Sequence, residues 1–156
     1  MPFQYSLHIK RSPKTEIEHH EYLHEETSCP VDKLLLNLRK LIEPEGTILV
    51  WNASFEKKRN EEMGFYKAEH FSFLKNVNDR VIDLMDPFRD DVIMDPEFLG
   101  SNSIKDVSEV MLPEYSYNDL TIKDGGSAAS EWQRVTFNEA TDKNTTYANL
   151  KKYCER

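Results

Sequence analysis

The sequence lacks long hydrophobic runs, and this absence excludes membrane-spanning classes of protein. No apolar stretch approaches the roughly 20 residues that a helix needs to cross a bilayer. The N-terminal segment MPFQYSLHIKRSPK has no apolar core of the kind found in secretory signal peptides. We therefore expect a soluble, cytoplasmic protein with no membrane partner.

Cysteine is also scarce. Cys29 and Cys154 are the two in the chain, and neither belongs to a CxxC pair or to a Cys/His spacing typical of zinc sites. The pattern indicates reduced thiols rather than a disulfide framework or a zinc site.

Positive charge is in deficit, because 28 Asp and Glu outnumber 20 Lys and Arg and leave a net charge of −8. This balance disfavours a protein that coats nucleic acid through a broad basic face, since phosphate neutralisation supplies most non-specific affinity. It does not exclude a metal-dependent nuclease, whose bound divalent ions offset clustered carboxylates and contact the phosphate directly.

The aromatic residues argue for a folded core. The hydrophobic share of 38% is low and the charged share of 31% is high, but eight Phe, seven Tyr and two Trp are spread along the chain. Wholesale disorder is therefore not expected. We predict one polar, globular domain over residues 1–156.

Hydrophobic periodicity predicts an α/β fold. Residues 3–9 alternate in polarity, and a turn at Ser12-Pro13 precedes residues 16–25, so the N-terminal part is expected to form a β-hairpin. The period becomes helical from residue 30, and a buried strand follows at 47–51. Further helices are expected near 54–64, 67–77 and 80–90, from Ser103 to Pro113, after Gly126, and from about residue 142 to the end.

Three histidines fall in the second strand of the predicted hairpin. His20 and His24 share a face of a strand and are candidate metal ligands. His19, His20 and His24 also stand beside Glu18, Glu21 and Glu25. We favour exposed strand residues over a metal site.

Two further patterns have a simple interpretation beside a functional one. Gly125-Gly126-Ser127 precedes a helix and could cradle a phosphate, but a plain turn and helix start is favoured. The basic run at residues 57–59 is typical of a solvated helix face, and it is kept as a secondary contact for a nucleic-acid backbone.

The end of the strand at 47–51 carries the strongest candidate site. Ligands bind at the carboxyl ends of strands in α/β folds, and Asn52-Ala53-Ser54-Phe55-Glu56 opens a helix at that point. A carboxylate in the first turn of a helix is either a cap or a part of a chemical site.

A strand followed by Asn-x-x-Phe-Glu resembles the second motif of the DEDD 3'-5' exonucleases of the ribonuclease H-like fold. That motif is usually Asn-x-x-Phe-Asp with the acid as a metal ligand, and here Glu56 is one methylene longer. Residues 80–84 are similar to the Asp-containing segment that follows, and residues 100–107 to its Ser-Leu-Lys helix start. With 117–120, 124–126 and 153–156 they complete a pattern of a bacterial branch of this superfamily.

Both ends of the active site in this resemblance are missing from the sequence. The third motif of the DEDDy subtype is Tyr-x-x-x-Asp, and Tyr153 is followed by three residues. The first motif, Asp-x-Glu on the first strand, is absent as well. The resemblance therefore implies a ribonuclease H-like mixed sheet flanked by helices, truncated at both ends and lacking its first central strand. We expect the hairpin to close against the strand at 47–51 in a shifted arrangement, or a neighbouring chain or domain to supply a strand.

The resemblance also implies catalytic roles. Phosphodiester hydrolysis by two ions held roughly 4 Å apart needs converging carboxylates. Glu56 would be a catalytic residue and a ligand of Mg²⁺ or Mn²⁺ in the full-length parent. Tyr153 would orient the attacking water. The two side chains are expected to face a common cleft.

Other residues of the motifs would bind substrate or support the site. Asn52, Phe55 and Lys57 are candidates to contact single-stranded DNA or RNA, although a core position is favoured for Phe55. Asp83 and Ser103 would be supporting residues. For Asp83 a cap on the helix that follows it is favoured over a metal role.

Two functions follow. The first is the core fragment of a metal-dependent nuclease domain, inactive as the isolated chain. The second is a degenerate ribonuclease H-like module that binds nucleic acid or a protein without catalysis. An Asp-x-Glu upstream and an Asp directly after Arg156 in the parent reading frame would favour the nuclease.

Overall fold

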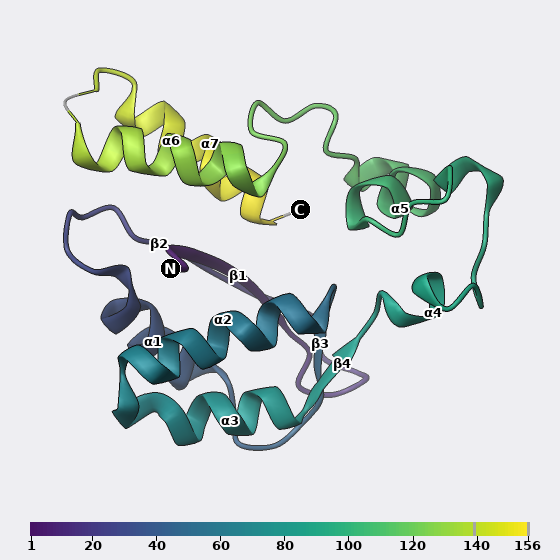
Figure 1. Ribbon diagram of the computed structural model, residues 1–156, viewed down its shortest axis with the longest axis horizontal. Helices are drawn as coiled ribbons and strands as arrows, with labels where there is room; N and C mark the ends of the chain where they lie inside the picture. Colours follow the sequence, from purple (N-terminus) through teal and green to yellow (C-terminus); the bar gives the residue numbers. More distant parts are fainter. Residues whose placement is uncertain (139, 156) are drawn as a thin grey trace. The chain divides into compact units, whose positions relative to one another are not determined.

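The computed structural model describes residues 1–138 and 140–155 and has a mixed α/β fold (Figure 1). The chain forms two compact units. One comprises Met1 and Leu35–Ser116, and the other comprises Pro2–Leu34 and Tyr117–Arg156. Helix α1 (Pro30–Leu41) begins in the second of these units and ends in the first.

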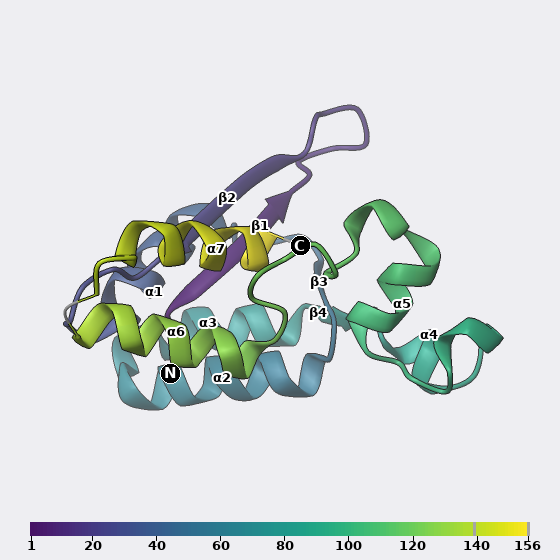
Figure 2. The same ribbon diagram turned by 90° about the horizontal axis from the view of Figure 1, so that it is seen from above.

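The unit of residues 35–116 is built on a short parallel strand pair. After α1 the elements are β3 (Ile48–Val50), α2 (Ala53–Tyr66), η1 (Ala68–His70), α3 (Phe71–Asp79), β4 (Val81–Asp83), α4 (Asp86–Arg89), η2 (Pro96–Phe98), α5 (Ile104–Met111) and η3 (Pro113–Tyr115). The other unit holds the strands β1 (Gln4–Ile9) and β2 (Glu18–Leu23) and the helices α6 (Gly125–Phe137) and α7 (Lys143–Glu155), shown from a second direction in Figure 2.

The predicted N-terminal hairpin is confirmed. β1 and β2 pair antiparallel from Gln4↔Leu23 to Ile9↔Glu18. The turn between them is closed by the backbone N–H of Thr15, which donates to the carbonyl of Ser12 at 3.2 Å. The alternating pattern of residues 3–9 therefore identified a real strand.

The helix expected near residues 80–90 is wrong. Residues 81–83 form β4, which pairs parallel to β3 with Val50 opposite Asp83, and the helix that follows is limited to α4. The β-branched residues Val81 and Ile82 suit a strand, and the β3 backbone satisfies their hydrogen bonds. The sequence pattern missed this because the pairing partner lies more than thirty residues upstream.

The helices α2 and α3 connect the two parallel strands and pack against each other. Gly64 of α2 permits this close approach, because a Cβ atom there would lie 3.4 Å from the ring of Phe71 and 3.5 Å from Leu74. Between the helices the Asn60 side-chain N–H₂ group donates to the side-chain oxygen Oδ1 of Asn78 at 2.8 Å. These contacts hold α2 and α3 against each other in the connection from β3 to β4.

The expected single mixed sheet does not form within the described residues. The hairpin and the parallel pair are separate two-stranded sheets, so the predicted pairing of the hairpin with the strand at 47–51 is wrong. The 47–51 strand pairs with β4, a segment that had been expected to be helical. A strand supplied by a neighbouring chain or domain stays a prediction.

The hairpin unit has its own hydrophobic core. Trp132 of α6 stacks on Phe3 with ring centroids 4.6 Å apart, and its indole N–H donates to the carbonyl of His24 at 2.6 Å. The buried members are Leu23, Ile122, Ala128, Trp132, Val135, Tyr147 and Leu150. Two of them, Tyr147 and Leu150, bring α7 into this core.

His24 is not the exposed strand residue that its sequence context indicated. It follows β2 and is buried, with 1% of its surface exposed. Its Nδ1 lies 2.9 Å from the hydroxyl of Tyr22, and its Nε2 lies 2.9 Å from the carbonyl oxygen of Ser28. Because the Ser28 carbonyl can only accept, the Nε2 atom of His24 donates to it and ties the loop that leads into α1 to the end of β2.

Cys29 and Cys154 are free thiols. Among the described residues, none of the helices combines the length and the apolar character needed to cross a membrane.

Candidate functional site

The candidate site begins where β3 ends. Asn52 adopts a left-handed conformation with φ 67° and ψ 70° and is the N-cap of α2. Its side-chain oxygen accepts from the backbone N–H of Phe55 at 3.3 Å and from the hydroxyl of Ser54 at 2.7 Å. Asparagine tolerates this backbone region better than most residues, so the residue type suits both the turn and the cap.

Asp83 links the end of β4 to this turn. Its carboxylate accepts from the backbone N–H groups of Asn52 at 2.9 Å, Ala53 at 2.8 Å and Met85 at 3.0 Å. The side chain is only 8% exposed, and Arg89 lies 3.7 Å away. The predicted cap on the following helix is wrong, because the N-cap residue of α4 is Met85 and no side chain caps that helix. Two of the three N–H donors to Asp83 belong instead to the start of α2.

These contacts set the charge state of Asp83. Burial by itself would raise the pKa of its carboxyl group, but the N–H donors of Ala53, Met85 and Asn52 and the charge of Arg89 outweigh burial and lower the pKa. Asp83 is therefore an ionised, internally bonded carboxylate.

Glu56 has the opposite environment. It stands in the first turn of α2 and is half-buried. Within the described residues no hydrogen bond or ion pair engages its carboxylate. Burial raises the pKa of Glu56, and the nearby charge of Arg59 opposes this only in part. The carboxylate is thus available to a ligand and easier to protonate than an exposed glutamate.

Phe55 is 54% exposed, so the predicted core position is wrong. The Arg59 guanidinium lies over its ring, 5.3 Å from the centroid. Lys57 is half-buried and Lys58 exposed, in agreement with a partly solvated basic face.

Ser103 lies at the helix start where the sequence placed it, and its supporting role in the site stays a prediction. It is the N-cap of α5, and its hydroxyl accepts from the N–H of Lys105 at 3.4 Å. The neighbouring carbonyl of Asn102 accepts from the indole N–H of Trp51 at 3.0 Å. Trp51 also packs on Phe88, with centroids 5.1 Å apart. The start of α5 is thereby joined to the end of β3, next to Asn52.

Tyr153 lies in the other compact unit. It is half-buried, with its ring edge-to-face to Tyr117 at a centroid distance of 6.0 Å. Burial, then the proximity of Tyr117, Asp124 and Cys154, raises the pKa of its hydroxyl. Because Glu56 and Tyr153 belong to different units, their common cleft stays a prediction.

The glycine pair before α6 is a helix start, as favoured. α6 begins at Gly125, and Asp124 caps it by accepting from the N–H of Ser127 at 2.9 Å and from its hydroxyl at 2.6 Å. A carboxylate therefore already occupies the helix N-terminus where an anion would bind.

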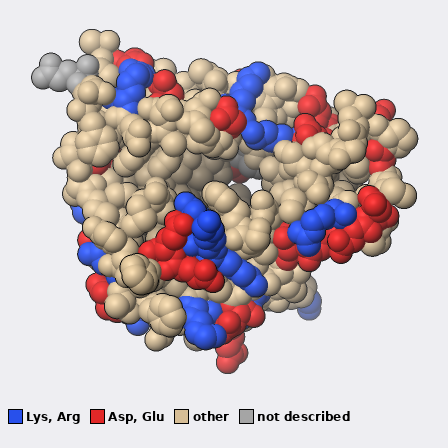
Figure 3. All heavy atoms as spheres, viewed as in Figure 1, with Lys and Arg blue, Asp and Glu red and all other residues tan. Residues whose placement is uncertain are grey.

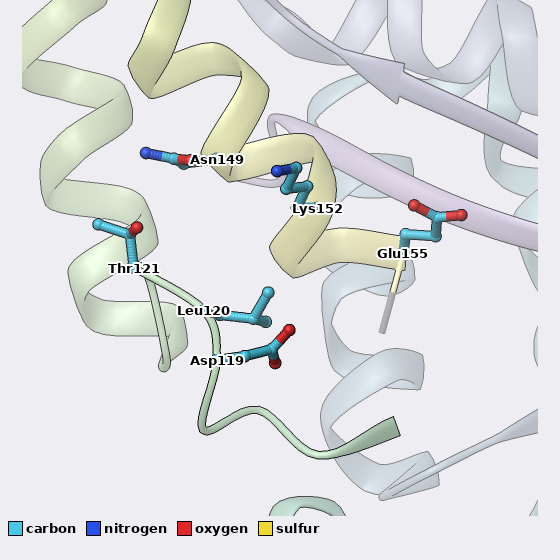
Figure 4. A pocket seen from close by; sticks show the side chains of 6 residues that line it. All are labelled: Asp119, Leu120, Thr121, Asn149, Lys152 and Glu155. Carbon is cyan, nitrogen blue, oxygen red and sulfur yellow. The ribbon is translucent and has the colours of Figure 1, made fainter. Parts of the chain in front are cut away.

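A cavity of about 270 Å³ in the hairpin unit was missed by the sequence analysis (Figure 4). One side is formed by α7 residues spaced three apart, and the other by the loop before α6. The lining residues are Asp119, Leu120, Thr121, Asn149, Lys152 and Glu155. The periodic polar residues on α7 were the available signal, but solvated helix faces have the same spacing.

The metal that the resemblance implies does not fit the described residues alone. No group of three or more His, Cys, Asp or Glu side chains in residues 1–138 and 140–155 is arranged to hold an ion. Both carboxylate oxygens of Asp83 accept hydrogen bonds from backbone N–H groups. Among the described residues of the motif, this leaves Glu56 as the carboxylate without a hydrogen bond. Mg²⁺ needs several oxygen ligands or substrate phosphates to stay bound.

The fold and the site together define a mixed α/β protein with polar and aromatic side chains at the carboxyl end of a parallel strand pair. The chain belongs to the family described as domain of unknown function DUF2779, whose model matches residues 1–103. Comparison with curated proteins and with solved structures gave no match. The matched range contains Asn52, Phe55, Glu56 and Asp83, but not Tyr153.

Proposed function

We propose that this chain is the core of a metal-dependent nuclease domain of the ribonuclease H-like fold, which hydrolyses phosphodiester bonds of single-stranded DNA or RNA. The observation that supports this best is the composition of the first turn of α2. An exposed Phe55 ring with a guanidinium over it and the free carboxylate of Glu56 lie together at the end of β3.

In this proposal the side chains of this turn bind a single-stranded nucleic acid. An exposed aromatic ring stacks on bases of any sequence, and a guanidinium beside it adds a cation–π contribution. Lys57 offers a phosphate contact, which positions the backbone without reading its sequence. The chain's own contribution is therefore strand binding, with Glu56 as one acid of the hydrolytic site.

Hydrolysis needs acids in addition to Glu56. A lone carboxylate does not retain Mg²⁺ or Mn²⁺, so the ion would bind only in a parent polypeptide that supplies further carboxylates. In this proposal the 156 residues bind single strands and do not cleave them.

A second candidate is a module that binds nucleic acid or protein without catalysis. The engagement of Asp83 favours it, because the other acid at this strand edge is committed to three backbone N–H groups. Both candidates share the strand-binding surface and differ in whether further acids complete the site.

The binding part is tested with fluorescently labelled single-stranded DNA and RNA and fluorescence anisotropy. Phe55→Ala should weaken binding by about 5- to 150-fold, since base–aromatic stacking contributes about 1 to 3 kcal/mol. Phe65→Ala is the matched control, because Phe65 is 92% exposed on the same helix. Equal effects of the two substitutions, or no binding by the unchanged chain, would contradict the proposed surface.

The catalytic part is tested by Mn²⁺- or Mg²⁺-dependent digestion of the same labelled strands. The 156 residues should release no nucleotides, and a parent polypeptide that carries Asp-x-Glu upstream and Asp after residue 156 should release them. Glu56→Gln should abolish this release. Digestion by the 156 residues alone would disprove the ligand count, and an inactive parent that still binds strands would favour the binding module.

A further inference from the structure

Asp83 determines the backbone on which the strand-binding side chains stand. The first N–H groups of a helix have no partner within the helix and must find acceptors elsewhere. In α2 the Asp83 carboxylate accepts from Asn52 and Ala53, and the Asn52 side chain accepts from Phe55. The Asp83 carboxylate and the Asn52 side-chain amide together therefore accept from the N–H groups at the start of α2.

The carboxylate also holds an unfavourable backbone conformation. Asn52 has a φ of 67°, and left-handed geometry at a residue other than glycine persists only where its surroundings stabilise it. The bond from the Asn52 N–H to Asp83 acts on that residue directly. Because Asp83 is 8% exposed, water does not readily replace it as the acceptor.

We infer that Asp83 is a positioning residue for single-strand binding. It touches no strand itself, but it fixes the turn that presents Phe55, Glu56 and Lys57 at the end of β3. The inference rests on the proposed function, since the effect on binding presupposes that this turn binds a strand. It extends that function because an acid of β4, Asp83, would position the binding side chains on the first turn of α2.

Charge and position predict opposite results for Asp83→Asn. Removing a negative charge near a phosphate chain should strengthen binding if charge alone mattered. A positioning role predicts weaker binding, because an amide presents an N–H₂ group to one of the backbone donors and disturbs the turn. The sign of the change therefore separates the two roles.

The experiment measures anisotropy of a labelled single-stranded DNA with the full chain and three variants. Asp83→Asn should weaken binding at least tenfold. Asp79→Asn, the same change at an exposed acid of α3, should leave the affinity within twofold. Val77→Ala, at a buried position of α3, lowers stability and should also leave binding within twofold. Unchanged or tighter binding by Asp83→Asn overturns the inference.

A second variant covers the case in which Asp83→Asn does not fold. Asp83→Glu keeps the charge but lengthens the side chain by one methylene, so it should weaken binding at least fivefold while the net charge stays the same. Wild-type affinity of Asp83→Glu would overturn the inference, since charge without position would then suffice.

Amide hydrogen exchange distinguishes failure of this inference from failure of the proposed function. If the unchanged chain does not bind single-stranded DNA, the proposed function is wrong and the affinities of the variants cannot be compared. Exchange at Asn52 and Ala53 then decides the positioning role. The positioning role predicts that both amides exchange at least tenfold faster in the Asp83 variants, while exchange at Leu74 is unchanged. Equal exchange at Asn52 and Ala53 in the variants and the unchanged chain would overturn the inference.

Discussion

At the scale of single residues, two carboxyl groups at one strand edge have pKa shifts of opposite direction, although burial raises the pKa of both. Asp83 is surrounded by backbone N–H donors and has a lowered pKa, whereas Glu56 lacks such donors and has a raised pKa. Hydrogen bonds to the charged form decide the difference. Asp83 therefore stabilises the turn as an anion at neutral pH, and the Glu56 carboxylate remains available for a ligand.

Asp83 should make stability fall in acid. Its folded-state pKa lies below the ordinary 3.8, so its contribution is fully present above that ordinary value and is lost as the pH falls through the folded-state pKa. Urea unfolding over this acidic range should show a steeper decline for the unchanged chain than for Asp83→Asn. Equal pH dependence of the two proteins would contradict this role of Asp83.

Glu56 should behave in the reverse sense. Its folded-state pKa lies above the ordinary 4.5, so its contribution is present at low pH and is lost as the pH rises through the folded-state value. Glu56→Gln, which cannot ionise, should melt at the same or a higher temperature than the unchanged chain at neutral pH. Glu61→Gln, at an exposed position of the same helix, is the control. A lower melting temperature for Glu56→Gln alone would mean that the ionised form is stabilised.

At the scale of elements, α2 depends on its N-terminal turn more than on its amphipathic character. Its buried residues are Met63 and Gly64, both near its C-terminal end. At the other end the backbone donors are satisfied by Asn52 and Asp83. A helix held in this way presents an exposed first turn without losing its order.

Substitutions at Asn52 should separate the cap from the backbone conformation. Asn52→Ala loses the cap, which contributes about 0.5 to 2 kcal/mol, and also strains a left-handed backbone. Asn52→Gly should cost only a few tenths of a kcal/mol, because glycine adopts the same φ freely. Urea unfolding measures both free energies. A larger loss for glycine than for alanine would show that the left-handed turn is unimportant.

At the scale of the whole molecule, charge is dispersed. The chain carries a net charge of −8, and on the face shown in Figure 3 the described Lys and Arg side chains lie among Asp and Glu side chains. A broad basic surface is not present on that face. If the proposed function holds, binding of a nucleic-acid strand on this face would depend on stacking and a few phosphate contacts, with a shallow response to salt.

Salt dependence should reveal the contribution of Lys57. Each phosphate contact to a single strand adds about −0.7 to the slope of log affinity against log salt. Lys57→Ala should make the slope shallower by about that amount and weaken binding to all sequences alike. Lys40→Ala, at an exposed position of α1, should leave the slope unchanged. Identical slopes for the unchanged chain and Lys57→Ala would remove Lys57 from the binding surface.

Much of the fold was predictable from local patterns. Alternation identified the hairpin, and helical spacing identified α1 and α7. The glycine pair at 125–126 marked the start of α6, and Ser103 marked the start of α5. Asn52 was correctly expected at the end of a strand, where α2 begins. These features depend on residues within a few positions of one another, so the sequence by itself determined them.

The tertiary structure alone decided the features that depend on distant residues. β4 is a strand because β3 lies beside it, and Asp83 bonds to N–H groups about thirty positions earlier in the chain. His24 is buried and Phe55 is exposed, although residue type favoured the opposite for both. Burial and hydrogen-bond partners arise from packing between elements, and a linear pattern of polarity does not specify which elements meet.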